Sequence, residues 1–327
     1  MSGLRDILAR FKGKRVVVFG DLIADVFVYG EISRISREAP VLILNHRETQ
    51  VVPGGGANAI HNLWALGAVT IPVGVVGDDA EGHQLLEQFS KLGVETGSIL
   101  VAKSHRTPAK MRILAGAVHS QRQQIVRLDS GSAIQNATIR TAVERKLKLA
   151  LKKADALLVS DYGYGLTTPQ LVSAVRRNSL KATLDSRFSL MSFSGMTAAT
   201  PNEPEVEAAL GISIGNDAKR LEWAGRTLLR KLKHDAILIT RGKDGMALFE
   251  RGKKTAHIPI YGSDEVTDVT GAGDTVIATF TLALAAGASY YQAAQLANHA
   301  GGIVVMKHGT RPVTYRELVE AVDRGTK

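Results

Sequence analysis

Asp268-Val269-Thr270-Gly271-Ala272-Gly273-Asp274-Thr275-Val276-Ile277-Ala278-Thr279 is the stretch on which the interpretation of this chain depends. A glycine-containing turn runs directly into an apolar segment of helical character, and Asp274 stands at the junction. Such a turn can aim several backbone N–H groups at one point, and the helix dipole adds positive potential there. The stretch therefore predicts an anion-binding turn with a candidate base beside it. A site that holds a phosphoryl group while deprotonating a hydroxyl needs both.

The composition predicts a large aliphatic core. The chain has 327 residues, of which 45% are hydrophobic and only 5% aromatic, so Ala, Val, Leu and Ile must fill the interior. It has no cysteine, which excludes disulfides, thiolate metal sites and a cysteine nucleophile. Met1–Lys14 lacks the apolar run of a secretory signal, and no stretch approaches the roughly 18 apolar residues of a membrane span. We expect a cytoplasmic protein with no membrane partner.

The net charge of +10 raises the question of nucleic-acid binding. The basic residues are spread along the chain, and the densest cluster, Arg140–Lys153, shows no interleaving with aromatic residues. We therefore expect no nucleic-acid partner, and we interpret the charge as a solvated surface with a site for anionic substrates. The nine histidines show no H-x-x-H or H-E-x-x-H spacing, which argues against a zinc site.

Short apolar runs alternate with helix-length segments along most of the chain. The runs that predict strands are Val16–Gly20, Thr70–Val76, Ala156–Ser160, Ala182–Asp185, Ala236–Thr240 and Met246–Phe249. The segments that predict helices are Ala57–Leu66, Gly82–Leu92, Ile139–Ala150, Pro169–Asn178, Ala218–Leu232, Thr275–Ala286 and Tyr290–Lys307. This alternation predicts an α/β fold with a mostly parallel sheet and helices on both of its faces.

Two stretches, Val26–Val52 and Arg106–Leu128, break this rhythm with alternating residues and no helical period. We expect them to form antiparallel strands outside the main sheet, as a small β lid. No linker, repeat or low-complexity segment divides the chain. Residues 1–327 are therefore predicted to form one domain, with lid segments at about residues 26–52 and 106–128.

The glycines of Gly54-Gly55-Gly56-Ala57-Asn58-Ala59 match G-x-G-x-x-A, and Asp78 follows about 20 residues later, as in a dinucleotide-binding fingerprint. Pro53 argues against that interpretation, because proline cannot donate a ladder hydrogen bond and a strand running directly into this turn is then not expected. The alternatives are a loop before a helix, or close backbone approach to a small polar ligand with Asn58 supplying an amide. No G-x-x-x-x-G-K-[ST] motif is present, so the later turn is the predicted phosphate site.

Polar or acidic residues follow several predicted strands. Asp25 follows the first strand, and Asp161 and Asp185 follow two others. Any one of them could cap a turn, as could Asp21, but the repetition is typical of an active-site rim at the carboxyl ends of parallel strands. Asn202 and Glu205 could organise a hydrated divalent cation, since Mg²⁺ keeps several waters and takes few protein ligands.

The glycine-rich Gly54–Asn58 and the turn Asp268–Asp274 resemble the two signatures of the ribokinase (PfkB) family of carbohydrate kinases. The resemblance extends from Val16 to about Val322. It implies a ribokinase-like three-layer α/β/α fold and ATP-dependent phosphorylation of a sugar hydroxyl, with a sugar or sugar phosphate and ATP as partners. It also implies Mg²⁺ and a monovalent cation such as K⁺. Because the lid strands have exposed edges and faces, we expect a homodimer joined through the lid.

Other residues resemble the family members that phosphorylate D-glycero-D-manno-heptose 7-phosphate to the 1,7-bisphosphate in lipopolysaccharide precursor synthesis. They are Tyr29-Gly30, Ser33-Arg34-Ile35-Ser36-Arg37-Glu38-Ala39-Pro40-Val41, Arg127-Leu128-Asp129 and Ser160-Asp161-Tyr162. Departures occur at Val26-Phe27 and at Asp185-Ser186-Arg187. The nucleotidyltransferase domain that many relatives carry is not in this sequence, so a stand-alone kinase is expected.

The resemblance also implies roles for individual residues. Asp274 would be the catalytic base, with the N–H groups of Gly271, Ala272 and Gly273 stabilising charge on the transferred group. The sugar would contact Asp25, Gly54, Gly55, Asn58 and Asp161, and its phosphate would contact Arg34, Lys110, Arg112 and Arg187. The nucleotide would lie against Asn202, Thr240, Gly242, Gly245 and Asn298. Asn202 and Glu205 would order the water shell of Mg²⁺, and Asp268 and Thr270 would hold the monovalent cation.

Two alternatives remain open at this point. One is a kinase of the same family that acts on another sugar, phosphosugar or nucleoside. The other is a non-catalytic sugar- or nucleotide-binding protein on a kinase scaffold.

Overall fold

The central strand β1 (Arg15–Gly20) divides its side chains between two layers of helices. Val16 and Val18 belong to one fully buried cluster, and Val17 and Phe19 belong to another. This follows from the alternation of side chains along a strand, with both faces of the sheet covered. The computed structural model describes residues 3–116, 122–175, 179–262, 268–307 and 309–325.

Thirteen strands lie within the described residues. After β1 they are β2 (Leu22–Ile35), β3 (Leu42–Gly55), β4 (Val69–Gly77), β5 (Ile99–Ala102), β6 (Ala109–Gly116), β7 (Gln123–Ser130), β8 (Ala156–Asp161), β9 (Lys181–Ser186), β10 (Ala198–Ala199), β11 (Ala236–Thr240), β12 (Met246–Glu250) and β13 (Ala256–Ile258). The main sheet has nine strands in the order β13-β12-β11-β10-β9-β8-β1-β4-β5. All its pairs from β11 to β5 are parallel, and β12 and β13 extend it by antiparallel pairing.

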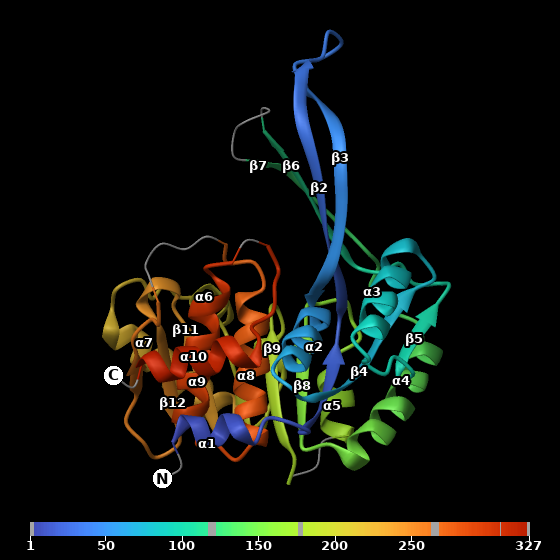
Figure 1. The fold of residues 1–327 in the computed structure, drawn as a ribbon. Coiled ribbons are helices and arrows are strands. Elements are labelled where there is room, and N and C mark those ends of the chain that lie inside the picture. Colours follow the sequence, from blue (N-terminus) through green and yellow to red (C-terminus); the bar gives the residue numbers. More distant parts are fainter. Residues whose placement is uncertain (1–2, 117–121, 176–178, 263–267, 308, 326–327) are drawn as a thin grey trace.

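Helices cover both faces of this sheet, as Figure 1 shows. The helices of the described chain are α1 (Leu4–Ala9), α2 (Gly56–Ala65), α3 (Ala80–Lys91), α4 (Ala137–Ala150), α5 (Pro169–Val175), α6 (Glu203–Leu210), α7 (Ala218–Leu232), α8 (Ala272–Ala285), α9 (Tyr290–Val304) and α10 (Tyr315–Gly325). Helices α1, α2, α3, α8, α9 and α10 contribute to the cluster around Val16 and Val18, and α4, α5, α6 and α7 contribute to the other. The predicted three-layer α/β/α arrangement is confirmed.

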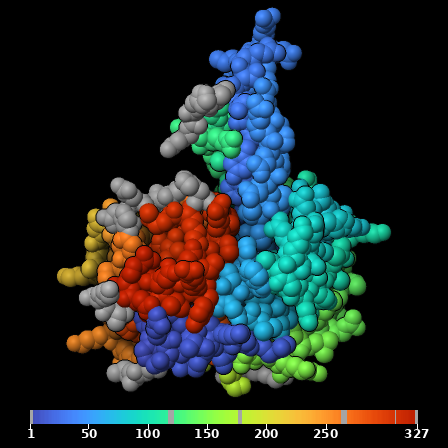
Figure 2. Space-filling view, viewed as in Figure 1, coloured from blue at the N-terminus to red at the C-terminus, as the bar shows by residue number. Residues whose placement is uncertain are grey.

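A second sheet stands off the main body. Its four strands lie in the order β3-β2-β6-β7. Figure 1 shows the long hairpin of β2 and β3 rising from the body with β6 and β7 beside it, and the space-filling view in Figure 2 shows the same projection. The smaller sheet that the sequence predicts is therefore present, although residues 117–121 of the second lid segment lie outside the described residues. The same is true of residues 176–178, at the end of the predicted helix Pro169–Asn178.

Two expectations about this sheet are wrong. Its strands are not all antiparallel, because β2 pairs with β6 in parallel from Ala24↔Ala109 to Glu31↔Gly116. The chain passes through β4 and β5 of the main sheet before it enters β6, and it therefore leaves the body in the same direction as β2. Pro53 also does not separate the strand from the glycines, since β3 runs to Gly55 and α2 begins at Gly56. Proline is tolerated there because β3 is an edge strand.

The predicted strands of the main sheet are confirmed, and β11 and β12 pair in antiparallel fashion on either side of Gly242–Gly245. No helix of the described chain is both long and apolar enough to cross a membrane. The parallel strands β1, β8 and β9 end on the same side of the sheet. Residues that follow these three strands are therefore brought close to one another.

Candidate active site

The turn before α8 forms because Gly271 has a positive φ of 76°, a conformation that few other residues adopt. The helix begins at Ala272, earlier in the chain than the predicted Thr275, so Asp274 lies in its first turn. Ala272 N donates to the carbonyl of Val269 (3.2 Å), whereas the N–H groups of Gly271 and Gly273 make no hydrogen bond to any described residue. Two of the three predicted N–H donors are thus free to meet an anion at the helix N-terminus.

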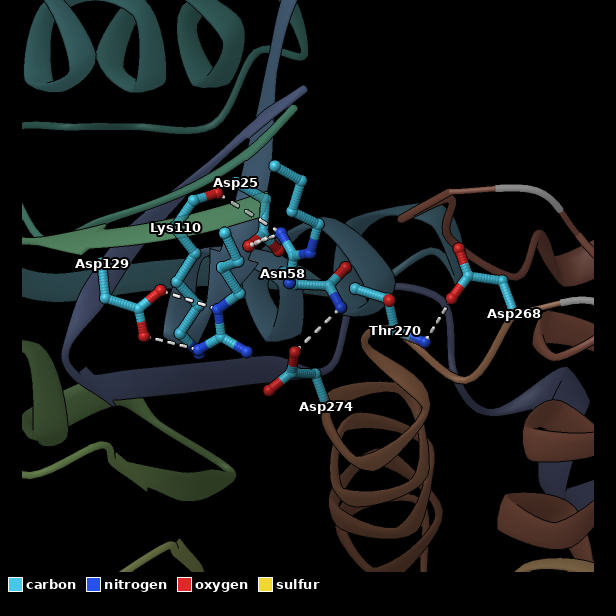
Figure 3. A network of polar contacts seen from close by, with 9 residues as sticks. Asp25, Asn58, Lys110, Asp129, Asp268, Thr270 and Asp274 are labelled. Carbon is cyan, nitrogen blue, oxygen red and sulfur yellow. Dashed lines mark hydrogen bonds and ion pairs between the residues drawn. The ribbon is translucent and has the colours of Figure 1, made fainter. Parts of the chain in front are cut away.

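The carboxylate of Asp274 is buried beside this turn, with 3% of the residue exposed. Burial raises its pKa to about 6, against the opposing effects of two hydrogen bonds and the nearby Lys110. Asn58 Nδ2 donates to Oδ2 (3.0 Å), and the hydroxyl of Tyr162 donates to Oδ1 (2.9 Å). Figure 3 shows the Asn58 amide pointing at Asp274 across the start of α8. A carboxylate with a pKa near neutrality is suited to act as a general base.

The side chain of Asn58 connects α2 to the turn. Besides Asp274, its Nδ2 contacts the carbonyl of Gly271 (3.3 Å), and its Oδ1 accepts a hydrogen bond from Asn62 Nδ2 (3.0 Å). A Cβ at residue 271 would lie 2.5 Å from this Nδ2, so only glycine permits the approach. Asn58 is predicted to contact the sugar, and the structure brings its amide to the candidate base.

The lid supplies a buried ion pair close to the glycines. Arg112 Nη1 of β6 contacts Asp25 Oδ1 of β2 at 2.7 Å, and the two side chains are only 11% and 6% exposed. The guanidinium of Arg112 also lies over the ring of Phe27. A Cβ at Gly54 would come within 2.5 Å of Asp25 Oδ2, so the backbone of β3 passes directly against this carboxylate. Asp25 and Arg112, predicted as separate sugar and phosphate ligands, are therefore partners of each other.

The side chain of Lys110 extends from the lid strand β6 toward the base. Its Nζ stands 4.5 Å from the centre of the Tyr162 ring, and burial lowers its pKa while the carboxylates of Asp25 and Asp274 raise it. On the neighbouring strand β7, Asp129 is in register with Lys110 and forms an ion pair with Arg127. Figure 3 shows Lys110, Asp25 and Asp129 on the same side of the lid, near Asp274.

Two predicted substrate residues are placed differently. Arg34 is exposed near the far end of β2, about 30 Å along the strand from Asp25 at roughly 3.3 Å per residue. Asp161 uses both carboxylate oxygens within its own loop: Oδ1 accepts from Gly163 N and Thr167 Oγ1, and Oδ2 accepts from Ser186 Oγ. The structure does not bring Arg34 to Asp274, and it gives Asp161 a role in holding the loop after β8.

Asn202 and Glu205 form the capping box at the start of α6. Glu205 N donates to Asn202 Oδ1 (2.8 Å) and Asn202 N donates to a Glu205 carboxylate oxygen (2.9 Å). Burial raises the pKa of Glu205. Burial also raises the pKa of Asp185 well above its usual range. The nearby carboxylates of Glu205, Asp274 and Asp161 raise this pKa further, and Arg187 lowers it in part. Two carboxylates and Arg187 thus face the same region beside the base.

Asp185 and Tyr162 are functional candidates to which sequence reasoning assigned no individual role, although Asp185 was placed on the predicted active-site rim. Asp185 stands at the end of the predicted strand Ala182–Asp185, two residues before Arg187, which was predicted to contact the substrate phosphate. This position was enough to indicate that Asp185 belongs to the site. Tyr162 follows Asp161 after β8, and nothing in the local pattern predicts that its hydroxyl reaches a residue more than 100 positions later. The guanidinium of Arg187 lies over the ring of Phe188, and the backbone N–H of Arg187 donates to the carbonyl of Asp161.

Three of the predicted nucleotide residues lie at the end of β11 and in the turn into β12, namely Thr240, Gly242 and Gly245, whereas Asn202 caps α6 and Asn298 lies on α9. Thr240 forms an isolated parallel bridge with Asn202, and Gly242 opens a short 3-10 helix, η3 (Gly242–Asp244). Gly245 has a φ of 74°, and a Cβ there would lie 2.1 Å from the carbonyl of Ile258, so glycine is required. Asn298 Nδ2 donates to the carbonyl of Pro259 (2.8 Å), which uses its amide within the protein.

Asp268 closes the other side of the turn. Its Oδ1 accepts from Thr270 N (2.8 Å) and its Oδ2 accepts from Gly309 N (3.2 Å). Figure 3 shows Asp268 and Thr270 together, on the opposite side of the helix start from the lid residues. The two predicted monovalent-cation ligands are thus adjacent.

Comparison with solved structures shows a ribokinase-like fold. A structure of Arabidopsis thaliana ribokinase with ribose and ATP superimposes with a TM-score of 0.73 at 22% identity, over 95% of this chain and 99% of that one. Escherichia coli phosphofructokinase-2 in complex with fructose-6-phosphate gives a TM-score of 0.76 at 17% identity, over 96% and 100% of the two chains. The fold is therefore that of a class of α/β sugar kinases.

Sequence comparison identifies the family. Residues 14–315 match the pfkB family of carbohydrate kinases, and the chain belongs to this family. It is 37% identical to the bifunctional protein HldE of Pelobacter propionicus and 39% identical to that of Geobacter sulfurreducens, over 98% and 97% of this chain. It spans 66% and 65% of the length of these two relatives. This chain is accordingly a carbohydrate kinase domain of that family, whose members are phosphotransferases with an alcohol group as acceptor.

Replacing Gly271 with alanine is expected to destabilise the fold by about 1–3 kcal/mol, because a Cβ would strain the positive φ and displace the Asn58 amide. Thermal unfolding of the two proteins measures this. Gly273→Ala is the matched control, since a Cβ at Gly273 meets nothing within 4 Å and φ there is not positive. An equal melting temperature for Gly271→Ala and the wild type would contradict the described packing.

Proposed function

We propose that this chain is an ATP-dependent kinase that transfers the γ-phosphate to a hydroxyl of D-glycero-D-manno-heptose 7-phosphate, giving the 1,7-bisphosphate used in lipopolysaccharide precursor synthesis. The observation that carries the phosphotransfer is the buried carboxylate of Asp274 beside the free N–H groups of Gly271 and Gly273. The choice of heptose rests on the similarity to the HldE proteins and on the run Ser33–Val41.

In this proposal, Asp274 accepts the proton of the attacking hydroxyl. Its pKa of about 6 leaves it largely ionised at neutral pH, and a pKa close to the working pH favours proton transfer. The N–H groups of Gly271 and Gly273, with that of Ala272 if it turns from the Val269 carbonyl, stabilise charge on the transferred group. The reaction then needs no covalent intermediate with the protein.

ATP and its metal would lie on the side of β11 and α6. In this proposal, the metal ion arrives with the nucleotide and keeps most of its waters. Hydrogen-bond acceptors for those waters are available from Glu205, Asn202 and the adjacent Asp185, whose pKa is raised by burial first and by the neighbouring carboxylates second. Bound Mg²⁺ would neutralise phosphate charge. Asp268 and Thr270 would hold K⁺, and Thr240, Gly242, Gly245 and Asn298 would border the nucleotide.

The acceptor would lie between the glycines of β3 and the lid. The Asp25–Arg112 pair offers hydrogen-bonding groups to sugar hydroxyls, together with Gly54 and Gly55. The cations left to meet a substrate phosphate are Lys110 and Arg187, because Arg112 is neutralised by Asp25. We treat residues 1–327 as one kinase domain in which the lid excludes water from the site and so limits ATP hydrolysis.

We propose in addition that two copies of the chain associate through their lids. Val126 and Leu128 of β7 are 41% and 53% exposed, and they stand in register with Ile113 and Met111, so one lid face presents an apolar strip. The hairpin end adds Ile35, which is 66% exposed. Apolar side chains gathered in this way on an open sheet are typical of an interface.

Leu128→Glu is expected to convert a dimer into a monomer, because it introduces a charge into the apolar strip. Sedimentation velocity measures the mass of each species. Trp223→Glu is the control, since Trp223 is also 53% exposed but lies on α7 of the main body. A wild-type chain that sediments as a monomer, or a Trp223 variant that dissociates equally, would refute the proposed interface.

Asp274→Asn is expected to lower kcat by about two to four orders of magnitude while leaving nucleotide binding largely intact, because only the proton acceptor is lost. In the wild type, kcat/KM should fall as the pH decreases through about 6, since protonation removes the base. Coupled ADP-release assays and nucleotide titration measure these effects. Near-normal turnover by the variant would eliminate Asp274 as the base.

The acceptor is tested by measuring ADP release with heptose 7-phosphate, fructose, ribose, tagatose 6-phosphate and adenosine at equal concentrations. Heptose 7-phosphate should give the highest kcat/KM. Turnover of another acceptor alone would make the protein a different sugar or nucleoside kinase. If none of the acceptors released ADP but the chain bound them, a non-catalytic binding protein would be favoured.

A further inference from the structure

The candidate base is held from two sides by donors that belong to different parts of the fold. Asn58 of α2 donates a hydrogen bond to Oδ2 of Asp274. Tyr162, the residue that follows β8, donates its hydroxyl hydrogen to Oδ1 at 2.9 Å. The proposed mechanism uses Asp274 but assigns no task to Tyr162. A carboxylate oxygen has two lone pairs, so Oδ1 can accept the hydrogen bond from the phenol of Tyr162 and a second hydrogen bond as well.

Tyr162 is itself firmly placed. Its backbone N donates to Asp21 Oδ2 (2.8 Å), which fixes the start of the loop after β8. Its ring lies against Gly55, where a Cβ would come within 3.1 Å of Cε2, and the Nζ of Lys110 stands 4.5 Å from the ring centre. The ring is therefore confined between the glycine strand and a lid cation, and its hydroxyl is directed at Asp274.

We propose that Tyr162 is a positioning residue for phosphoryl transfer: its hydroxyl holds the Asp274 carboxylate in the orientation that receives the proton of the acceptor. The proposal rests on the proposed role of Asp274 as the base. Both partners are held in a fixed place, so the bond restricts rotation of the carboxylate without requiring Tyr162 to touch the reacting atoms. Reactive geometry of this kind is sensitive to displacements of about 1 Å.

The protonation states are compatible with this arrangement. Burial and the neighbouring Asp274 raise the pKa of Tyr162 well above 10, so the phenol remains a donor throughout the working range. The charged groups that face Asp274 from the described elements around it are Lys110 of β6, Asp25 of β2 and Asp185 of β9, while Asn58 of α2 is neutral. Because the phenol bond favours the ionised carboxylate, its removal should raise the pKa of Asp274.

Tyr162→Phe tests the proposal, because it deletes one oxygen and keeps the ring between Gly55 and Lys110. We expect kcat at pH 8 to fall about tenfold, with KM for ATP within about twofold of the wild type. The acid limb of the kcat profile should move to higher pH by about one unit, which is the same free energy as a tenfold change. Tyr164→Phe is the matched control: the hydroxyl of Tyr164 makes no described contact with Asp274, so kcat and the acid limb should be unchanged.

Each other outcome is decisive. An unchanged kcat and acid limb in Tyr162→Phe would overturn the proposal, as would a lower kcat with an unmoved acid limb, which would indicate a structural role. Melting temperatures of the variants identify unfolding, and a loss shared equally by Tyr164→Phe would also reject the idea. All variants are assayed with the acceptor that the wild type turns over, so an error in the proposed sugar does not affect the result. Failure of the proposed base appears separately, as turnover retained by Asp274→Asn.

Discussion

The amide of Asn58, placed between the carbonyl of Gly271 and the carboxylate of Asp274, joins the two halves of this chain at the point where chemistry is expected. The contact spans more than 200 residues of sequence, and it forms only because Gly271 has no Cβ. Asn62 Nδ2 donates to the Oδ1 of this amide, and Asn62 Oδ1 accepts hydrogen bonds from Thr275 Oγ1 and Val313 N. The orientation of the base is therefore a property of the packing of α2 against α8, and any change in that packing alters the site.

The parallel sheet concentrates negative charge at one edge. Asp21 follows β1, Asp161 and Asp185 lie at the carboxyl ends of β8 and β9, and Asp274 faces them from α8. Burial raises the pKa of Asp21 to about 7 and that of Asp274 to about 6, with Coulombic repulsion among the carboxylates adding to both effects. The lid, which is a separate sheet, places cations close to these negative charges. Proton affinity at the site thus depends on how the lid lies, since Lys110 lowers the pKa of Asp274 while Asp25 raises it.

Local patterns predicted the elements of this structure better than their contacts. The apolar run Val16–Gly20 predicts a buried strand, and the turn at Gly271 predicts the start of a helix, because both depend on residues next to each other in sequence. The parallel pairing of β2 with β6 and the pairing of Asp25 with Arg112 could not be predicted in this way, since they depend on where distant segments return. The same reason explains why the contact of the Tyr162 hydroxyl with Asp274, and the contacts of Asp161 and Asn58 within the protein, were not predicted. Pro53 was misjudged because whether proline is tolerated depends on the position of its strand in the sheet.

The Asp25–Arg112 pair constrains how the lid can recognise its ligand. A buried ion pair is a poor source of stability, because desolvation of both charges offsets most of their attraction. Its position on the lid strands β2 and β6, against Gly54 and close to Lys110, instead indicates a recognition surface. The pair presents carboxylate acceptors and guanidinium donors side by side, and a sugar hydroxyl both accepts and donates. A polyol can therefore satisfy the remaining hydrogen-bonding capacity of both residues without separating them, whereas an apolar molecule of the same size would leave those groups unpaired. Under the proposed function, a hydroxyl-rich acceptor would meet this neutral, preorganised pair, and a substrate phosphate would meet Lys110 and Arg187 beside it.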